Sequence, residues 1–87
     1  MIEKLILSYI DRMTIGDIDD FARKHGIVLN SDELDLVYYH IKNNWRTIVY
    51  GNPKPILEDL RNKVDSLTYQ KIENLYVEFK NKYSSYL

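Results

Sequence analysis

Two histidines, His25 and His40, are the side chains through which any proton transfer near neutral pH would have to run in this cysteine-free chain. His25 is predicted to end a helix, where a partly charged imidazole suits the helix dipole. Neither histidine has a carboxylate or a second histidine four residues away, which is the spacing that a metal-binding helix uses. The pattern therefore indicates structural histidines. It predicts no catalytic, cofactor-binding or metal-binding residue, and no enzyme activity.

Three aspartates, Asp17, Asp19 and Asp20, superficially resemble a cluster for calcium or magnesium. A calcium loop alternates its oxygen ligands through an irregular segment that contains a central glycine and ends in a glutamate. Here Gly16 precedes the acids, and no glutamate completes the register. Acidic residues at the start of a helix complement its dipole, so the pattern favours a capping role.

The eight tyrosines and Trp45 are the residues most suggestive of a function, because tyrosine and tryptophan are enriched where proteins meet. The last predicted helix, about residues 66–86, carries a heptad seam with alternating spacings of three and four: Tyr69, Ile72, Tyr76, Phe79, Tyr83 and Tyr86. Packing against the rest of the chain is favoured for this seam over a partner surface. Its tip should extend past so small a core. The candidate partner contacts are therefore Tyr83, Tyr86, Leu87 and Trp45.

Three predicted helix starts position these residues. Thr14, Asn30 and Asp65 each stand at an N-cap, and each is flanked by an apolar pair with the spacing of a hydrophobic staple. The pairs are Met13 with Ile18, Leu29 with Leu34, and Val64 with Tyr69. Glu33 completes a capping box with Asn30, and Asp17 imitates one with Thr14.

The elements that follow from these signals are all helical. Apolar spacing predicts a first helix over roughly residues 2–12, and Gly26 stands where a left-handed residue ends the second. Residues 45–50 are predicted to continue the third helix after a kink, in preference to an extended link. Asn52 is expected to cap a fourth helix with Pro53 at its first position. The predicted fold class is all-α, a compact bundle of four or five short helices in one domain, residues 1–87.

Composition narrows the class of protein. The apolar fraction of 45 per cent is enough for a folded core and too high for a disordered chain. The absence of cysteine excludes disulfides and thiolate metal sites. The apolar stretch in residues 1–10 is broken by Glu3 and Lys4, lacks the basic leader of a signal peptide and is too short to span a bilayer. We therefore expect a cytoplasmic protein without a membrane segment.

Charge is split along the chain, with a net −4 in residues 1–41 and +3 in residues 42–87. Attraction between the two halves within one bundle accounts for this split. The alternative is a nucleic-acid accessory protein that uses basic residues of the second half: Lys42, Arg46, Lys54, Arg61 and Lys63. A helix-turn-helix interpretation of residues 15–43 would place three acids, Asp32, Glu33 and Asp35, in the DNA groove. Nucleic acid is therefore not the expected partner.

The order of these features resembles a family of short, uncharacterised helical proteins from Gram-positive bacteria. The resemblance rests on Thr14-Ile-Gly-Asp-Ile18, on residues 21–29 and on Ile41-Lys-Asn-Asn44, followed by Leu75, Phe79 and Tyr83 in the closing helix. It implies a cytoplasmic helical domain and no particular chemistry. The function expected from the sequence is a small non-enzymatic protein–protein interaction module, which self-associates or docks a larger partner through its C-terminal aromatic helix.

Overall fold

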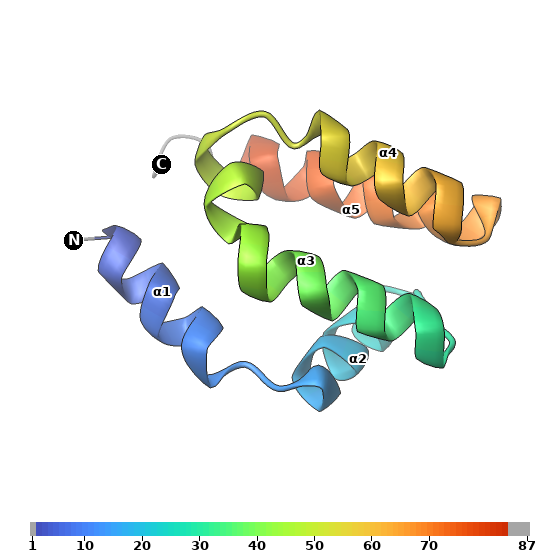
Figure 1. Ribbon diagram of the computed structural model, residues 1–87, viewed down its shortest axis with the longest axis horizontal. Coiled ribbons are helices and arrows are strands. Elements are labelled where there is room, and N and C mark those ends of the chain that lie inside the picture. Colours follow the sequence, from blue (N-terminus) through green and yellow to red (C-terminus); the bar gives the residue numbers. More distant parts are fainter. Residues whose placement is uncertain (1, 84–87) are drawn as a thin grey trace.

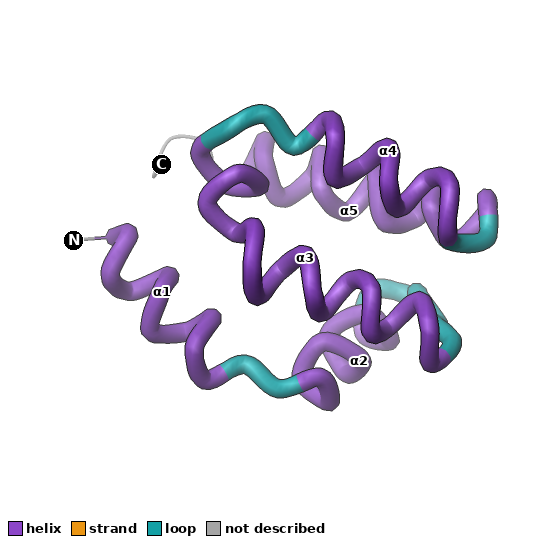
Figure 2. The backbone as a smooth tube through the Cα atoms, in the orientation of Figure 1, coloured by secondary structure: helices purple, strands orange, loops and turns teal. Residues whose placement is uncertain are grey.

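The computed structural model describes residues 2–83, and these residues form five helices and no strand (Figure 1, Figure 2). The helices are α1 (Ile2–Arg12), α2 (Ile15–Lys24), α3 (Ser31–Tyr50), α4 (Lys54–Lys63) and α5 (Ser66–Tyr83). The predicted all-α bundle is therefore confirmed. Short loops join the helices, and α3 crosses the middle of the molecule (Figure 2).

The helix starts predicted at Thr14 and Asn30 are both complete capping boxes. The Thr14 hydroxyl accepts a hydrogen bond from the Asp17 N–H at 3.1 Å, and the Asp17 carboxylate accepts one from the Thr14 N–H at 2.9 Å. Asn30 and Glu33 repeat this exchange at 2.8 and 3.0 Å. These bonds satisfy backbone donors that a helix leaves unpaired, so the aspartate at position 17 is a capping residue.

Gly26 ends α2 as the sequence predicts. Its φ is +76°, the left-handed region that favours glycine. The N–H of Ile27 donates to the Ala22 carbonyl at 2.8 Å, and the N–H of Gly26 donates to the Arg23 carbonyl at 3.0 Å. This pair of bonds is a Schellman motif, and it turns Ile27 back into a buried cluster with Ala22.

The third helix is kinked at Asn44 (φ −130°, ψ 21°) and then continues to Tyr50, which confirms the continuation predicted for residues 45–50. The start of α4 differs by one residue from the prediction. Pro53 is the N-cap and the helix begins at Lys54. Because proline offers no side-chain acceptor, Asn52 caps from one position further back, accepting a hydrogen bond from the Lys54 N–H at 3.1 Å.

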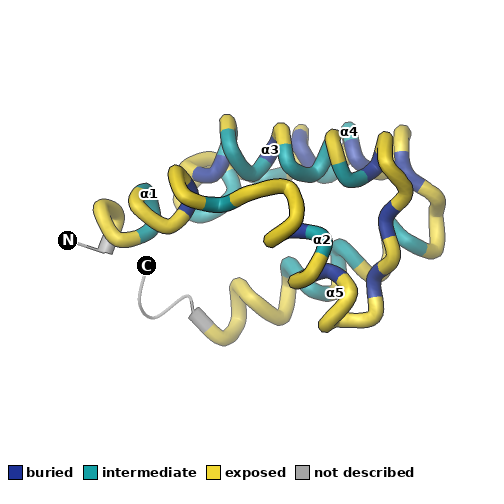
Figure 3. The backbone as a smooth tube through the Cα atoms, turned by 90° about the horizontal axis from the view of Figure 1, so that it is seen from below, coloured by how far each residue is buried: buried dark blue, intermediate teal, exposed yellow. Residues whose placement is uncertain are grey.

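Two buried clusters form the core around α3. One joins α2 to the loop that follows it (Ala22, Ile27 and Leu29), and the other joins α4 to its following turn (Ile56, Leu60 and Val64). Leu34 packs against the first and Tyr69 against the second, which confirms the staples predicted at Leu29 and Val64. The helix α3 packs against α1, α2 and α4, whereas α5 lies beside α4 (Figure 1). Figure 3 shows that exposure rises along α5 toward its C-terminal half.

Glu33 links the start of α3 to the start of α5. One carboxylate oxygen accepts from the Asn30 N–H and the other from the Asp65 N–H, each at 3.0 Å. Asp65 in turn caps α5, because its carboxylate accepts from the N–H groups of Leu67 and Thr68. Glu33 is only 8% exposed. Both of its oxygens have partners, as a buried carboxylate requires.

Substitution of Gly26 by valine should lower the free energy of unfolding by about 1–2 kcal/mol. A Cβ at this position would meet no atom within 4 Å, so the cost comes from the backbone conformation alone. Urea denaturation measures it. The matched control is Gly16→Ala inside α2, which should stabilise by up to about 1 kcal/mol. Equal midpoints for Gly26→Val and the parent would contradict the left-handed helix end.

Substitution of Glu33 by alanine should lower the free energy of unfolding by about 2–4 kcal/mol, because it leaves two backbone N–H groups without their acceptors. Glu33→Gln retains the side-chain length and one acceptor, so it should cost less. Urea denaturation of both variants is the measurement. If Glu33→Ala costs less than about 1 kcal/mol, the carboxylate does not hold the two helix starts together.

Candidate functional site

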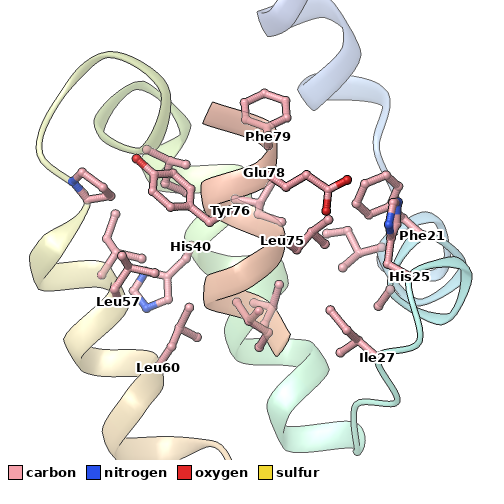
Figure 4. Close-up of a pocket in the computed structure, with 18 of the residues that line it drawn as sticks. Phe21, His25, Ile27, His40, Leu57, Leu60, Leu75, Tyr76, Glu78 and Phe79 are labelled. Atoms are coloured by element: carbon pink, nitrogen blue, oxygen red, sulfur yellow. The ribbon is translucent and has the colours of Figure 1, made fainter. Parts of the chain in front are cut away.

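An apolar groove with a volume of about 710 Å³ lies between α5 and the rest of the bundle (Figure 4). Its lining comes from all five helices, and most of it is aliphatic or aromatic. The floor is formed by side chains of α3 and α4, including Val37, Ile41, Ile56 and Leu60. Such a surface excludes water without offering many polar partners, so it suits an apolar ligand surface rather than a charged substrate.

The groove exists because α5 is held against the bundle through its N-terminal half. Tyr69 and Ile72 pack against the buried clusters, and the Lys71 ammonium donates to the Gly26 carbonyl at 3.3 Å. Further along the helix, Phe79 lines the groove and is 40% exposed. The predicted packing of the seam against the chain is therefore confirmed for its first half only. The next two seam residues, Tyr76 and Phe79, line the groove.

The opposite wall belongs to α2. Phe21 lines the groove, is 52% exposed and stacks against His25 with 4.5 Å between ring centroids. The Glu78 side chain extends from α5 toward Phe21 and His25 (Figure 4). Aromatic residues from two helices thus stand on either side of the opening, where they would be the first to contact a ligand.

His40 on the groove floor is held by two partners. Its Nε2 lies 2.7 Å from the Asp59 carboxylate, and its Nδ1 lies 3.2 Å from the Asn44 amide nitrogen. With the amide donating to Nδ1, the Nε2–H donates to Asp59. Both ring nitrogens are engaged within the chain. The network fastens α4 to the kinked part of α3.

Asp59 is the centre of this network. The hydrogen bond from the Lys63 ammonium, at 2.8 Å, and the one from His40 lower the pKa of the Asp59 carboxyl below its usual value. Both bonds stabilise the charged form, and they outweigh the effect of partial burial. Asp59 is therefore a carboxylate at neutral pH and an acceptor for both neighbours.

The structure buries one of the candidate partner contacts predicted from the sequence, and two others lie outside the described residues. Trp45 is 5% exposed, with its ring against Tyr50 and under the Arg46 guanidinium, so it is a core residue here and not a surface contact. Tyr83 ends α5, while Tyr86 and Leu87 lie outside the described residues.

The basic residues considered for nucleic acid are largely engaged within the chain. The Lys42 ammonium donates to the carbonyls of Ile10 and Asp11 at the end of α1, at 2.6 and 3.0 Å. Arg46 pairs with Glu3 at 2.9 Å, Lys63 with Asp59, and Arg61 with Glu58. Lys42 and Arg46 join α3 to α1, whereas the pairs of Lys63 and Arg61 lie within α4. Among residues 2–83, no three acidic or histidine side chains gather into a group that could hold a metal ion.

Sequence reasoning missed the groove and the His40–Asp59 pair. The pair joins two helices across 19 positions, and no local pattern signals such a contact. The groove had a weak signal: α5 carries apolar residues off its seam, namely Leu67, Leu75 and Val77. Such a helix is apolar on more than the single face that a core covers.

The chain matches no protein-family model, no curated protein and no solved structure. The resemblance to short helical proteins from Gram-positive bacteria therefore stays a prediction. Within the part of the chain that the structure describes, every helix is too short or too polar to cross a membrane.

Substitution of Asp59 by asparagine should lower the free energy of unfolding by about 1–2 kcal/mol at pH 7. The reason is that the neutral amide no longer offers a negative charge to Lys63 and His40. The folded-state pKa of Asp59 is lowered from 3.8, so its contribution is present above pH 3.8 and is lost as pH falls through the folded value. The difference in the free energy of unfolding between Asp59→Asn and the parent should therefore become smaller in acid. Urea denaturation at pH 7 and below pH 3 measures this.

The matched control is Glu58→Gln, the neighbouring exposed carboxylate on α4, which should change stability by less than about 0.5 kcal/mol at either pH. A penalty for Asp59→Asn that is the same at both pH values would contradict the charged role of Asp59.

Proposed function

We propose that this protein is a non-enzymatic protein-interaction module whose groove binds the apolar face of an amphipathic helix. The observation that carries the proposal is the apolar groove of about 710 Å³ beside α5. Helix-in-groove recognition uses this arrangement, with apolar side chains spaced along one helix face filling a hydrophobic channel.

The rim of the groove favours a protein segment over an enclosed small ligand. Tyr9, Phe21 and Phe79 come from three different helices, line the groove and remain exposed. A small ligand is usually buried over most of its surface, whereas this groove stays open beside its aromatic rim. Large aromatic residues around an apolar centre are the composition of interaction hot spots.

The polar groups of the groove support a binding role over catalysis. His40 is occupied by Asp59 and Asn44, and His25 stacks on Phe21 at the rim. The other charged side chains of the lining, Glu78 and Lys82, both come from α5. The cytoplasmic location and the kinship to bacterial helical proteins, both suggested by the sequence, are part of this proposal.

The C-terminal residues Tyr83, Tyr86 and Leu87 continue the seam in sequence beyond Phe79. They stay in the proposal as candidate partner contacts, and Tyr86 and Leu87 lie outside the described residues. Nucleic-acid binding receives less support, because four of the five basic residues on which it depends have partners within the chain.

Photo-crosslinking in cells that make the protein tests this function. A benzophenone side chain replacing Phe21 should form a covalent adduct with another polypeptide, because that position borders the groove. Mass spectrometry should place the attachment in a helical segment with apolar residues at i, i+3, i+4 and i+7. The same replacement at Leu67, which is 65% exposed on α5 outside the groove, is the matched control. No adduct at Phe21, or equal adducts at both positions, would overturn the proposal.

A further inference from the structure

We propose that the helix received by the groove is α5 of a second copy of this chain, packed antiparallel against α5 of the first. This inference rests on the proposed function of the groove as a helix-binding site. It identifies the partner as a second copy of this chain, so the groove is filled only in a symmetric dimer.

The spacing of the seam selects the kind of partner. Tyr76 and Phe79 line the groove, and the spacing of three and four continues in the sequence to Tyr83 and Tyr86 (Figure 4). A seam with this period packs best against another helix of the same period, since each side chain then fits between residues of the facing helix. In this chain, α5 is the helix that carries such a seam.

The charges beside the seam select the orientation. In an antiparallel pair that places Tyr76 opposite Phe79 of the second copy, position 73 lies beside position 80 of the second copy. Both positions flank the seam on the same side, because they are seven residues apart. Position 73 is glutamate and position 80 is lysine. Two-fold symmetry repeats the pair, so the interface contains two Glu73–Lys80 ion pairs.

A parallel pair lacks this complementarity. In a parallel arrangement the residues that flank the seam on opposite sides meet, which brings Leu75 to Lys80 and Thr68 to Glu73. Neither combination is an ion pair. The charge pattern of α5 therefore matches a second copy of itself in the antiparallel direction only.

The side chains in question are placed for this contact. Lys80 is exposed. Glu73 is partly buried, and one of its oxygens accepts a hydrogen bond from the Tyr69 hydroxyl at 3.1 Å, which leaves the other to face a cation. Phe79 lines the groove and is 40% exposed. A second α5 would cover Phe79 and contact Phe21 on the opposite wall.

Sedimentation equilibrium of the full chain and two charge-reversal variants tests the proposal. The parent should form dimers. Lys80→Glu and Glu73→Lys should each weaken dimerisation by about tenfold or more, because each places like charges together twice. An equimolar mixture of the two variants should regain the parent affinity as a heterodimer, since every pair is then complementary. The control Lys54→Glu on α4 changes the net charge by the same amount as Lys80→Glu and should leave dimerisation unchanged.

The variants must first be shown to fold, and each result then supports or contradicts the proposed dimer. Circular dichroism and thermal melting first establish that both variants fold, and the double variant Glu73→Lys/Lys80→Glu should dimerise like the parent. A parent that stays monomeric to about 1 mM, or a mixture that associates no better than its components, overturns the second copy as occupant. If the Phe21 crosslink then identifies a different protein, the groove remains a helix-binding site. If no crosslink forms, the groove itself loses its proposed function.

Discussion

The arrangement of this bundle depends on the buried carboxylate of Glu33. It holds the first turn of α3 with one oxygen and the Asp65 backbone with the other, so the starts of α3 and α5 are pinned to the same point. The helix α5 is therefore fixed at its N-terminal end, where Tyr69 and Ile72 also pack into the core. Leu75 packs against the buried cluster that contains Ala22 of α2, and the seam residues Tyr76 and Phe79 line the groove. The groove is the space left between a helix fastened at one end and the bundle beside it.

Polar contacts complete the attachment of the outer helices to α3. His40 and Asp59 fasten α4, and Lys42 binds the carbonyl groups at the end of α1. These bonds fix position but cover little apolar area, because they lie at helix ends and faces already turned toward α3. Apolar side chains on the other faces of α1 and α2, such as Tyr9 and Phe21, consequently remain at the groove rim. A domain of this size has too little interior to bury every helix face.

The groove is therefore both an uncovered part of the core and the proposed interaction surface. Part of the apolar area that the chain leaves uncovered lies in this groove, at Tyr9, Phe21 and Phe79, while other exposed apolar side chains lie elsewhere on the molecule. A partner helix in the groove would extend the core formed by Val37, Ile56 and Leu60 and would exclude water from the aromatic rim. The proposed antiparallel pairing of α5 gives this extension a defined direction, because the charges of Glu73 and Lys80 flank the same seam.

Local signals in the sequence determined the helices. The caps at Thr14 and Asn30, the left-handed Gly26 and the spacing of the α5 seam were all predictable, because each depends on atoms within about one or two turns of the chain. The tertiary structure alone decided which half of the seam is covered, that Trp45 is buried, and that a groove separates α5 from α2. These outcomes follow from contacts such as Glu33 with Asp65, 32 positions apart. No local sequence pattern predicts these outcomes, because they depend on how the folded helices pack against one another.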